Sequence, residues 1–438
     1  MSASLAHSAR AGRATVRLLR GAQSNPPDGP DLQTHLERWR DLRHRPSPAL
    51  LDELAASGLA GHGGGFFPVA AKWRAIGNGS RQSPVVVANG AESEPASHKD
   101  ALLLTQTPHL VLDGLAVAAN TLRARRAVVF VSTPSLRAVE QAIAERRRAR
   151  MDPVTMDAME APDRFLAGQE SAVVNVLSGR RQGLPSFVGL ESIRERGVDG
   201  RPTLVQNVET LAHVGFVARY GAEWFRRVGT HEWPGTMLLT LTRPGGPQIV
   251  EAAFGTPLMD TVGLTREDAA LYQGALLGGY GGGWVSMTSL TGLALLEKDA
   301  RRAGATLGPG VVVLLPRDVC ALAEIADVVN YMESQGAGQC GPCVNGLAEL
   351  ASALDDLAFG PGRSDRHVPR ILALCDLVES RGACRHPDGV ARFVRTGITV
   401  FADEVQSHRR HGACPATAAP RFLPVPNRVS SRRAVSRA

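Results

Sequence analysis

The feature that most constrains the fold is an alternation of short apolar runs and helical segments between residues 84 and 148. The runs Pro84–Asn89 and Ala127–Ser132 are dominated by valine, which is typical of strands buried on both faces of a parallel sheet. Helical spacing predicts helices at about 108–123 and 134–148. This alternation indicates an α/β domain, in which ligands bind at the carboxyl ends of the strands.

A glycine-rich loop precedes the first strand. Helices are expected at 32–43 and at Ser47–Ser57, where a serine N-cap starts the second helix and Gly58 ends it. The loop does not fit a dinucleotide fingerprint, because its third glycine position holds Phe66 and because it comes before the strand. A plain turn is one interpretation. The other is an anion site for a nucleotide phosphate or a flavin ring, built from successive N–H groups with Lys72 nearby.

Three polar segments carry the candidate ligand-binding residues. One such segment alone would be interpreted as a solvated charged loop. Three of them, rich in Asn, Gln and Glu, fit a site that hydrogen-bonds the edge of a neutral heterocycle. They are Asn89, Glu92, Glu94 and Lys99 after the first strand, Gly168, Gln169 and Glu170 within 165–181, and Gln206, Asn207 and Thr210 within 202–210.

The pattern of the sequence changes twice after this region. From about Pro234, short strand-like runs separated by glycine indicate a small β-rich domain. From Asp318 onward helical spacing returns, and four apolar stripes predict a helical bundle that contains all the cysteines. The stripes are Leu322, Ile325, Val329 and Met332; Leu347, Leu350, Leu354 and Leu357; Ile371, Leu374 and Val378; and Val390, Phe393, Phe401 and Val405.

The six cysteines lie in the last third of the chain. Cys340 and Cys343 form a CxxC motif, which can hold zinc, a redox disulfide or an iron–sulfur cluster. No His or Cys pair with zinc-finger spacing accompanies this motif, which disfavours zinc. Cys375 lies on an apolar stripe and is expected to be a buried core thiol, as is Cys320. Cys414 borders the C-terminal tail.

The net charge of +7 resides at the two ends of the chain. Residues 1–24 hold four arginines and residues 415–438 hold five, with no acid in either segment, so the body between them carries −2. A near-neutral body disfavours a nucleic-acid binder, which gathers Lys and Arg on one folded surface. We expect disordered ends, although the first also has the composition of a transit peptide. No apolar run approaches the roughly 20 residues that span a bilayer.

Five segments, in chain order, are GLAGHGGGFFPVAAKW, VVVANGAESEPASHKD, FLAGQESAVVNVLSGRR, GRPTLVQNVETLAHV and ESQGAGQCGPCVNG. Together they resemble the flavoprotein (F) component of respiratory complex I and the flavin subunits of NAD-linked hydrogenases and formate dehydrogenases, over about residues 45–410. The resemblance implies an α/β fold with a Rossmann-like FMN-binding domain, a small β-grasp domain and a C-terminal four-helix iron–sulfur domain. The implied boundaries are 1–44 for a disordered basic extension and first helix, 45–233, 234–316 and 317–412 for the three domains, and 413–438 for a disordered basic tail.

The resemblance also implies roles for individual residues. Glu94 is expected to face the nicotinamide, and Glu170 is expected beside the flavin ring, as the two catalytic residues. Phe67 and Phe187 are expected to sandwich the adenine of NADH. The remaining expected contacts are Gly61, Gly63, Gly64, Lys72, Asn89, Glu92, Gly168, Gln169, Asn207 and Thr210 for the flavin, and Cys340, Cys343 and Cys384 for the iron–sulfur cluster.

The chain departs from the family pattern at several of these positions. Ala91, Phe165 and Gln169 replace two carboxylates and one phenol of the family motifs. Ala337 stands where the family has the first of four cysteine ligands of a [4Fe–4S] cluster. Three thiolates can hold a three-iron cluster, or a four-iron cluster with a labile or borrowed ligand. A vestigial site is the alternative.

The implied function is hydride transfer from NADH to FMN, followed by transfer of single electrons to the cluster and to partner subunits with further clusters. The implied location is the cytoplasm, or the inner face of a membrane where a complex holds the protein peripherally. Two alternatives stay open. One is a catalytically silent paralogue used for assembly or ligand binding, and the other is an FMN oxidoreductase with another reductant or acceptor and no cluster.

Overall fold

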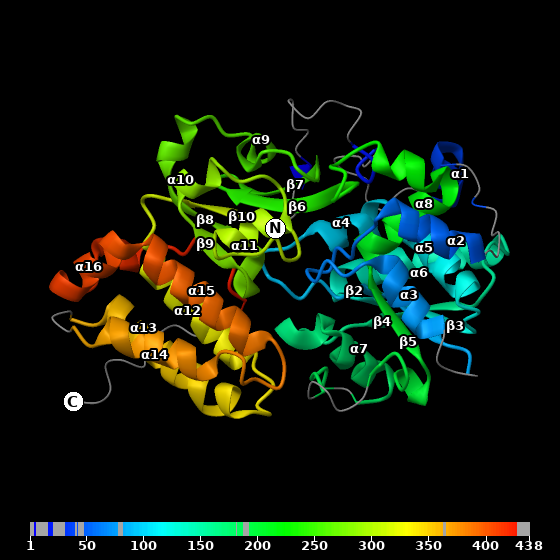
Figure 1. The fold of residues 1–438 in the computed structure, drawn as a ribbon. Helices are drawn as coiled ribbons and strands as arrows, with labels where there is room; N and C mark the ends of the chain where they lie inside the picture. Colours follow the sequence, from blue (N-terminus) through cyan, green and yellow to red (C-terminus); the bar gives the residue numbers. More distant parts are fainter. Residues whose placement is uncertain are drawn as a thin grey trace. The chain divides into compact units, whose positions relative to one another are not determined.

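The chain divides into two compact units, Met1–Pro316 and Arg317–Ala438, whose helices and strands are labelled in Figure 1. Within the part of the chain that is described, no single helix is long and apolar enough to cross a membrane. The helices α4 (Lys99–Gln106) and α5 (Pro108–Thr121) pass the same test of length and composition only as a pair bent by 94°. The computed structural model describes residues 4–5, 16–20, 31–39, 42, 48–77, 82–180, 182–186, 192–361 and 365–426.

The first unit contains a four-stranded parallel sheet. Its strand order is β4, β3, β2, β5. Valines dominate the two central strands, because β-branched side chains pack well on a pleated surface that is buried on both faces. The strands are β2 (Val85–Gly90), β3 (Arg126–Val131), β4 (Met156–Glu160) and β5 (Thr203–Asn207).

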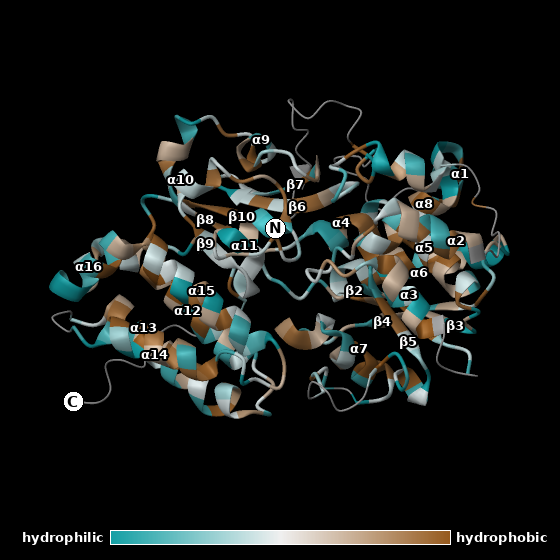
Figure 2. Ribbon diagram, viewed as in Figure 1, coloured by the Kyte–Doolittle hydropathy of each residue, from teal (hydrophilic) through white to brown (hydrophobic). Residues whose placement is uncertain are grey.

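Alternate residues of these strands face two apolar layers. Val86, Ala88 and Val129 pack in one core with α5, α6 and α8, whereas Val87 and Phe130 pack in another with α7. The expected α/β fold is thereby confirmed, and Figure 2 shows hydrophobic and hydrophilic residues alternating around most helices, as amphipathic packing requires. The helices are α4 (Lys99–Gln106), α5 (Pro108–Thr121), α6 (Thr133–Arg148), α7 (Glu170–Leu177) and α8 (Val208–Arg226).

Three helices precede this sheet in the sequence, and their apolar residues join its larger core. Leu54 and Trp73 are buried there. The serine predicted to start the second helix, Ser47, lies outside the described residues. The helices are α1 (Leu32–Trp39), α2 (Pro48–Ser57) and α3 (Val69–Gly77).

The N-terminal extension differs from the disordered segment that was predicted, as far as it is described. Arg17 is buried, and its guanidinium donates to the carbonyl oxygens of Trp224 and Phe225 while lying 4.0 Å from the Trp224 ring centroid. Its backbone N–H donates to Glu251. Hydrogen bonds and a cation–π contact thus hold an arginine that composition alone suggested to be solvated. A two-residue strand, β1 (Ser4–Leu5), pairs in parallel with β7 (Gly246–Ala253).

A second sheet in the same unit contains six strands in the order β1, β7, β6, β10, β8, β9. β6 and β7 form an antiparallel hairpin that turns at Gly245 and Gly246, both with positive φ, which glycine adopts without steric cost. These strands lie where the β-rich region was predicted. The bounds are β6 (Thr236–Arg243), β7 (Gly246–Ala253), β8 (Tyr272–Leu277), β9 (Gly283–Val285) and β10 (Val311–Pro316), with the short helices α9 (Leu258–Val262), α10 (Met287–Leu290) and α11 (Glu297–Arg302).

The second unit is helical. The first three predicted stripes each match one helix, but the fourth divides, because the backbone leaves helical geometry at Phe401 (φ −102°, ψ 34°). The described part of the unit therefore has five α-helices where four stripes were predicted. They are α12 (Ala321–Ser334), α13 (Leu347–Phe359), α14 (His367–Val378), α15 (His386–Val400) and α16 (Ala402–His411), and a π-helical turn (Pro342–Gly346) precedes α13.

The predicted disordered tail, 413–438, is ordered over its described part. The carboxylate of Glu324 on α12 accepts the backbone N–H groups of Phe422 and Leu423, each at 2.8 Å, and Leu423 is buried. The guanidinium of Arg421 donates to Asp327 at 2.8 Å. One carboxylate that satisfies two N–H groups is a long-range contact that composition could not indicate.

Candidate functional site

The parallel sheet reverses its winding direction between β2 and β5. β3 and β4 follow on one side of β2, while β5 pairs on its other side, which makes this position the topological switch point. Asn89 and Asn207 are register partners at the carboxyl ends of these two strands. Ligands of open α/β sheets bind at this place, because the loops that leave the two strands diverge there.

The glycine loop between α2 and α3 packs against the end of β5. The N–H of His62 donates to Thr210 Oγ1 at 2.9 Å, and a Cβ on Gly63 would lie 3.2 Å from Asn207 Cβ. Gly64 has a positive φ of 96°. Among the described residues, no acceptor is hydrogen-bonded to the N–H groups of Gly63, Gly64 and Gly65. Successive free N–H groups form a concavity suited to an anionic or electron-rich ligand.

Asn207 is held by both ends of its side chain. Its Oδ1 accepts the N–H groups of Glu209 and Thr210 and caps α8, while its Nδ2 donates to Asp100 at 2.8 Å. Lys99, which is fully buried, pairs with Asp100 at 2.7 Å and Glu209 at 2.8 Å. Burial opposes the charge of Lys99, but the two carboxylates outweigh it and raise the pKa of its ammonium. This network fixes the N-terminus of α8 beside the glycine loop.

The segment before α7 closes the other side of the switch point. Asn89 Nδ2 donates to the carbonyl of Gly168 at 2.8 Å. Lys72 on α3 donates to the carboxylate of Glu170 and to the carbonyl of Val205 on β5. Three of the predicted polar segments and the glycine loop therefore meet here. The side chain of Gln169 accepts the N–H groups of Ser171 and Ala172 and so serves as the N-cap of α7.

The side chain of Glu92 is hydrogen-bonded to the N-terminus of helix α4. Its carboxylate accepts the N–H groups of Asp100 at 2.9 Å and Ala101 at 2.7 Å, together with the hydroxyl of Ser97. Burial, and then the nearby Asp100 carboxylate, raise its pKa to about 7. These contacts give Glu92 a role in starting α4, and a direct flavin contact by this residue stays a prediction.

Glu94 is a buried carboxylate that contacts the β8–β9 connection. Its Oε2 accepts the N–H of Tyr280 at 2.8 Å, and its Oε1 accepts the N–H of Ala96 at 3.3 Å. A Cβ on Gly279 would lie 2.4 Å from this carboxylate and would displace it, and the positive φ of 73° at this position also favours glycine. Burial raises the pKa of Glu94 to about 7. A carboxyl poised near neutrality can hold or release a proton at physiological pH.

The structure describes only one of the two aromatic residues predicted to bind adenine. Phe67 is exposed on the glycine loop, with the Arg194 guanidinium carbon 5.5 Å from its ring centroid. Phe187 lies outside the described residues. An exposed aromatic side chain beside a guanidinium can stack on a planar ligand, so the role of Phe67 stays a prediction.

In the second unit, Cys340 and Cys343 face each other with their sulfur atoms 3.7 Å apart. Cys384 is buried nearby, and burial together with the Cys340 and Cys384 thiols raises the pKa of Cys343 to about 12. Ala337 supplies no side-chain donor; its backbone N–H bonds to the Cys343 sulfur. Three thiols therefore fit an iron–sulfur cluster, and the fourth ligand position has no protein thiol.

Sequence reasoning missed several groups that build the first site. Tyr280 contributes through its backbone from a glycine-rich turn that was interpreted as a strand separator, so no residue-type signal marked it. Asp100 and Glu209 lie next to residues that were identified, and charged side chains at the start of helices α4 and α8 were the available signal. Cys375 is buried, as predicted.

Two family models match the chain. A Nuo51 FMN-binding domain matches residues 54–215, which include the glycine loop and all three polar segments. A NADH-ubiquinone oxidoreductase-F iron–sulfur binding region matches residues 323–408, which include Cys340, Cys343 and Cys384. The departures noted above, such as Ala337, thus lie inside regions that otherwise match.

Curated relatives and solved structures agree with these models. The F component of the NADH-quinone oxidoreductase of Mycobacterium bovis is 29% identical over 391 residues, which cover 82% of this chain and 84% of the relative. The F component of the Escherichia coli enzyme is 26% identical over 380 residues, with the same coverage. A chain in the crystal structure of an air-oxidised NAD⁺-reducing [NiFe]-hydrogenase superposes with a TM-score of 0.78 at 24% identity, covering 92% of this chain and 68% of that one. The chain is thus similar over most of its length to F components of NADH-quinone oxidoreductases, and its two matched regions are those of an FMN-binding domain and of an iron–sulfur binding region.

Proposed function

We propose that this chain is a flavoprotein that takes hydride from NADH onto FMN and passes single electrons to an iron–sulfur cluster and to partner subunits. The observation that carries this proposal is the convergence of the glycine loop, Asn89, Asn207 and the start of α7 at the switch point of the parallel sheet. The matched FMN-binding and iron–sulfur regions support it independently.

Bound FMN would supply the conversion of a two-electron donor into single electrons. The chain would hold it through the free N–H groups of the glycine loop and the amide of Asn89. Lys72 would contribute a positive charge, which favours an electron-rich ring, while its pairing with Glu170 fixes its position. Glu94 would hold a proton near the site at neutral pH, since its pKa lies near 7.

The onward path of the electrons requires other proteins. A cluster on Cys340, Cys343 and Cys384 would accept electrons singly. The chain contains no second CxxC motif, so a further relay has to come from partners. The names of the relatives, which are parts of larger oxidoreductases, support a place among other redox subunits. Attachment to the inner face of a membrane would then be indirect, through such a complex.

The test is the visible spectrum of the full chain after anaerobic purification, followed by addition of NADH. We expect a flavin band that NADH bleaches. Gly63→Val should lose flavin, because even a Cβ at this position would lie 3.2 Å from Asn207 Cβ. Gly292→Ala is the matched control, since its added methyl would contact only the Ser289 carbonyl, at 3.6 Å. A flavin that does not respond to NADH would overturn the proposal.

A further inference from the structure

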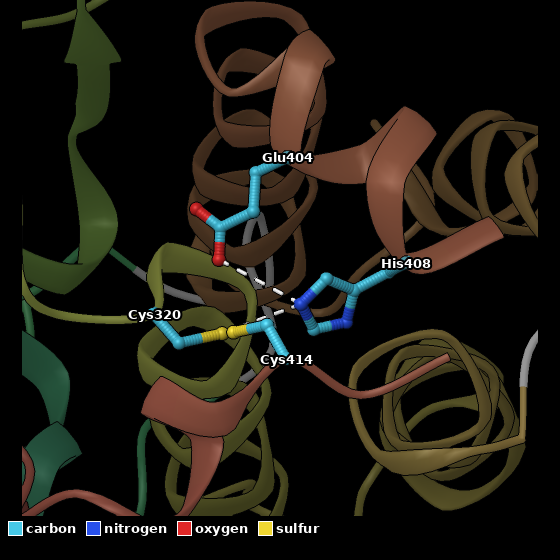
Figure 3. Close-up of side chains that lie close together, drawn as sticks. All are labelled: Cys320, Glu404, His408 and Cys414. Carbon is cyan, nitrogen blue, oxygen red and sulfur yellow. Dashed lines mark hydrogen bonds and ion pairs between the residues drawn. The ribbon is translucent and has the colours of Figure 1, made fainter. Parts of the chain in front are cut away.

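A second group of metal-ligating side chains lies in the helical unit, apart from the cysteines already described. Cys320 is the N-cap of α12. Glu404 and His408 are one turn apart on α16, and Cys414 follows after Gly412, whose positive φ of 82° turns the chain back. Figure 3 shows the four side chains pointing toward one another from these separate segments.

The distances within this group match tetrahedral coordination. The four donor atoms all lie within 4.8 Å of one another. Cys320 Sγ lies 3.7 Å from His408 Nε2, and His408 Nε2 lies 3.8 Å from Glu404 Oε1. Zinc bonds of about 2.3 Å to sulfur and about 2.05 Å to nitrogen, at a tetrahedral angle, place the two donors about 3.6 Å apart. The donor atoms of the cluster are therefore spaced closely enough to coordinate one metal ion.

Burial and unmet hydrogen bonds add an independent observation. His408 is 1% exposed and Cys320 is 2% exposed. Glu404 Oε1, which faces His408, is a buried oxygen with no hydrogen-bond partner among the described residues. The other oxygen of Glu404 accepts the N–H of Ala321 at 3.2 Å, which orients the carboxylate into the cluster. A buried carboxylate oxygen without a donor is costly unless a cation satisfies it.

We propose that Cys320, Glu404, His408 and Cys414 form a structural zinc site that joins the start of α12 to the end of α16. Two thiolates and an imidazole select zinc over magnesium or calcium, which prefer oxygen ligands. All four positions are filled by protein groups, which is typical of a structural site rather than a catalytic one. Binding of the ion replaces the two thiol protons, which are released to solvent, and no electron is transferred.

This site is distinct from the iron–sulfur ligands. The helix α12 lies between Cys320, at its N-terminus, and Cys340, beyond its C-terminus. A helix of its 14 residues is about 20 Å long. The matched iron–sulfur region spans residues 323–408 and so excludes both Cys320 and Cys414.

The alternative to a bound zinc ion is a disulfide between Cys320 and Cys414, because their two sulfur atoms are neighbours within the cluster (Figure 3). Such a bond would require an oxidant and would leave Glu404 and His408 without a partner ion. Both cysteines are free thiols in this structure. The two possibilities differ in metal content and in mass, so one preparation distinguishes them.

The test uses the untagged full chain, purified anaerobically, with zinc and iron measured separately by mass spectrometry. We expect about one zinc per chain. Cys414→Ser and Glu404→Gln should lose most of the zinc while retaining flavin and iron, which also separates this result from any failure of the proposed function. Cys375→Ala, a buried cysteine of the same unit outside the cluster, should keep its zinc.

Cobalt(II) provides a second readout on the same protein. Exchange of zinc for cobalt should give the absorption of a tetrahedral thiolate complex, and Cys414→Ser should weaken it strongly. The proposal is overturned if the full chain binds neither zinc nor cobalt, or if intact-mass analysis shows a disulfide between Cys320 and Cys414. It is equally overturned if zinc content is unchanged in both cluster variants.

Discussion

At the scale of single residues, the polar side chains of the predicted flavin site differ in the hydrogen bonds that they accept. Glu92, Gln169 and Asn207 each use their side chains to satisfy the N-terminus of a helix. Glu94 instead accepts single N–H groups from Ala96 and Tyr280 while buried. Residue type and spacing alone predicted these positions as candidate ligand-binding residues. Which of them cap helices could not be predicted, because that depends on where the helices begin.

Glu94→Gln should remove a pH dependence that the native chain shows. The folded pKa is about 7 against an ordinary value of 4.5, so the carboxyl stays protonated in the folded state while the unfolded state ionises. The stability that Glu94 contributes is present below pH 4.5 and is lost as the pH rises through 7. Urea unfolding at pH 5 and pH 8 should show a smaller loss of stability in the variant.

The control for this prediction is Glu223→Gln, which changes a largely exposed carboxylate paired with Arg227 on α8. It should leave the pH dependence as in the native chain. Glu94→Gln should keep the part of that dependence that Glu92 contributes, because the pKa of Glu92 shifts in the same direction. An identical pH dependence in Glu94→Gln and the native chain would contradict the assignment. The rate of flavin bleaching by NADH should likewise lose an inflection near pH 7 in Glu94→Gln alone.

At the scale of elements, the periodic patterns in the sequence were sufficient to predict strands and helices. They were not sufficient to predict where a helix breaks or which strands pair. Strands β2 and β3 and helices α5 and α6 lie where valine runs and helical spacing predicted them, because burial on a given face dictates that pattern. The break at Phe401 was not predictable, since the apolar stripe continues through it. Pairing of β5 beside β2, which creates the site, depends on contacts more than 100 residues apart in sequence.

Asn207→Ala should destabilise the chain by about 1 kcal/mol, because α8 loses its N-cap. It should also weaken FMN retention, since Asp100 loses the Nδ2 donor and the start of α8 is no longer fixed beside the glycine loop. Ser286→Ala removes the cap of the short helix α10, outside the site, and should leave flavin content unchanged. Equal flavin content in both variants would contradict a positioning role for Asn207.

Asp113 on α5 joins several elements of the first unit through one buried carboxylate. It accepts from Arg146 on α6 at 2.9 Å, bonds to His35 on α1 at 2.8 Å and pairs with Arg219 on α8. Burial disfavours its charge, but Arg146, and then His35 and Arg219, outweigh burial and lower the pKa of Asp113. The sequence showed these residues only as ordinary charges on helices.

Asp113→Asn should cost about 3–5 kcal/mol in the free energy of unfolding, because it removes the charge of a fully buried carboxylate that pairs with His35, Arg146 and Arg219. The matched control is Asp199→Asn, which breaks an exposed pair with Arg126 (3.3 Å) and should cost at most about 1 kcal/mol. Urea denaturation followed by circular dichroism measures both. A cost for Asp113→Asn no larger than that of the control would show that the network is dispensable.

At the scale of the whole molecule, the charged ends are less separate from the body than composition indicated. Arg17 and Arg421 belong to the two basic segments, yet both are held by the folded units. The near-neutral body still contains every candidate site. The proposed cofactor sites are divided between the two units, since the residues proposed to hold the flavin lie within Met1–Pro316 and the six cysteines lie within Arg317–Ala438.

This division predicts that the two cofactor loadings can be changed separately. Ala337→Cys restores a thiol where the chain offers only a backbone N–H, next to Cys340 and Cys343. Iron and acid-labile sulfide should rise toward about four per chain, because four thiolates hold a [4Fe–4S] cluster more firmly than three. Flavin content should stay unchanged, and Ala337→Ser should behave like the native chain. If the iron content of Ala337→Cys equals that of Ala337→Ser, the three cysteines are not the remaining ligands of such a cluster.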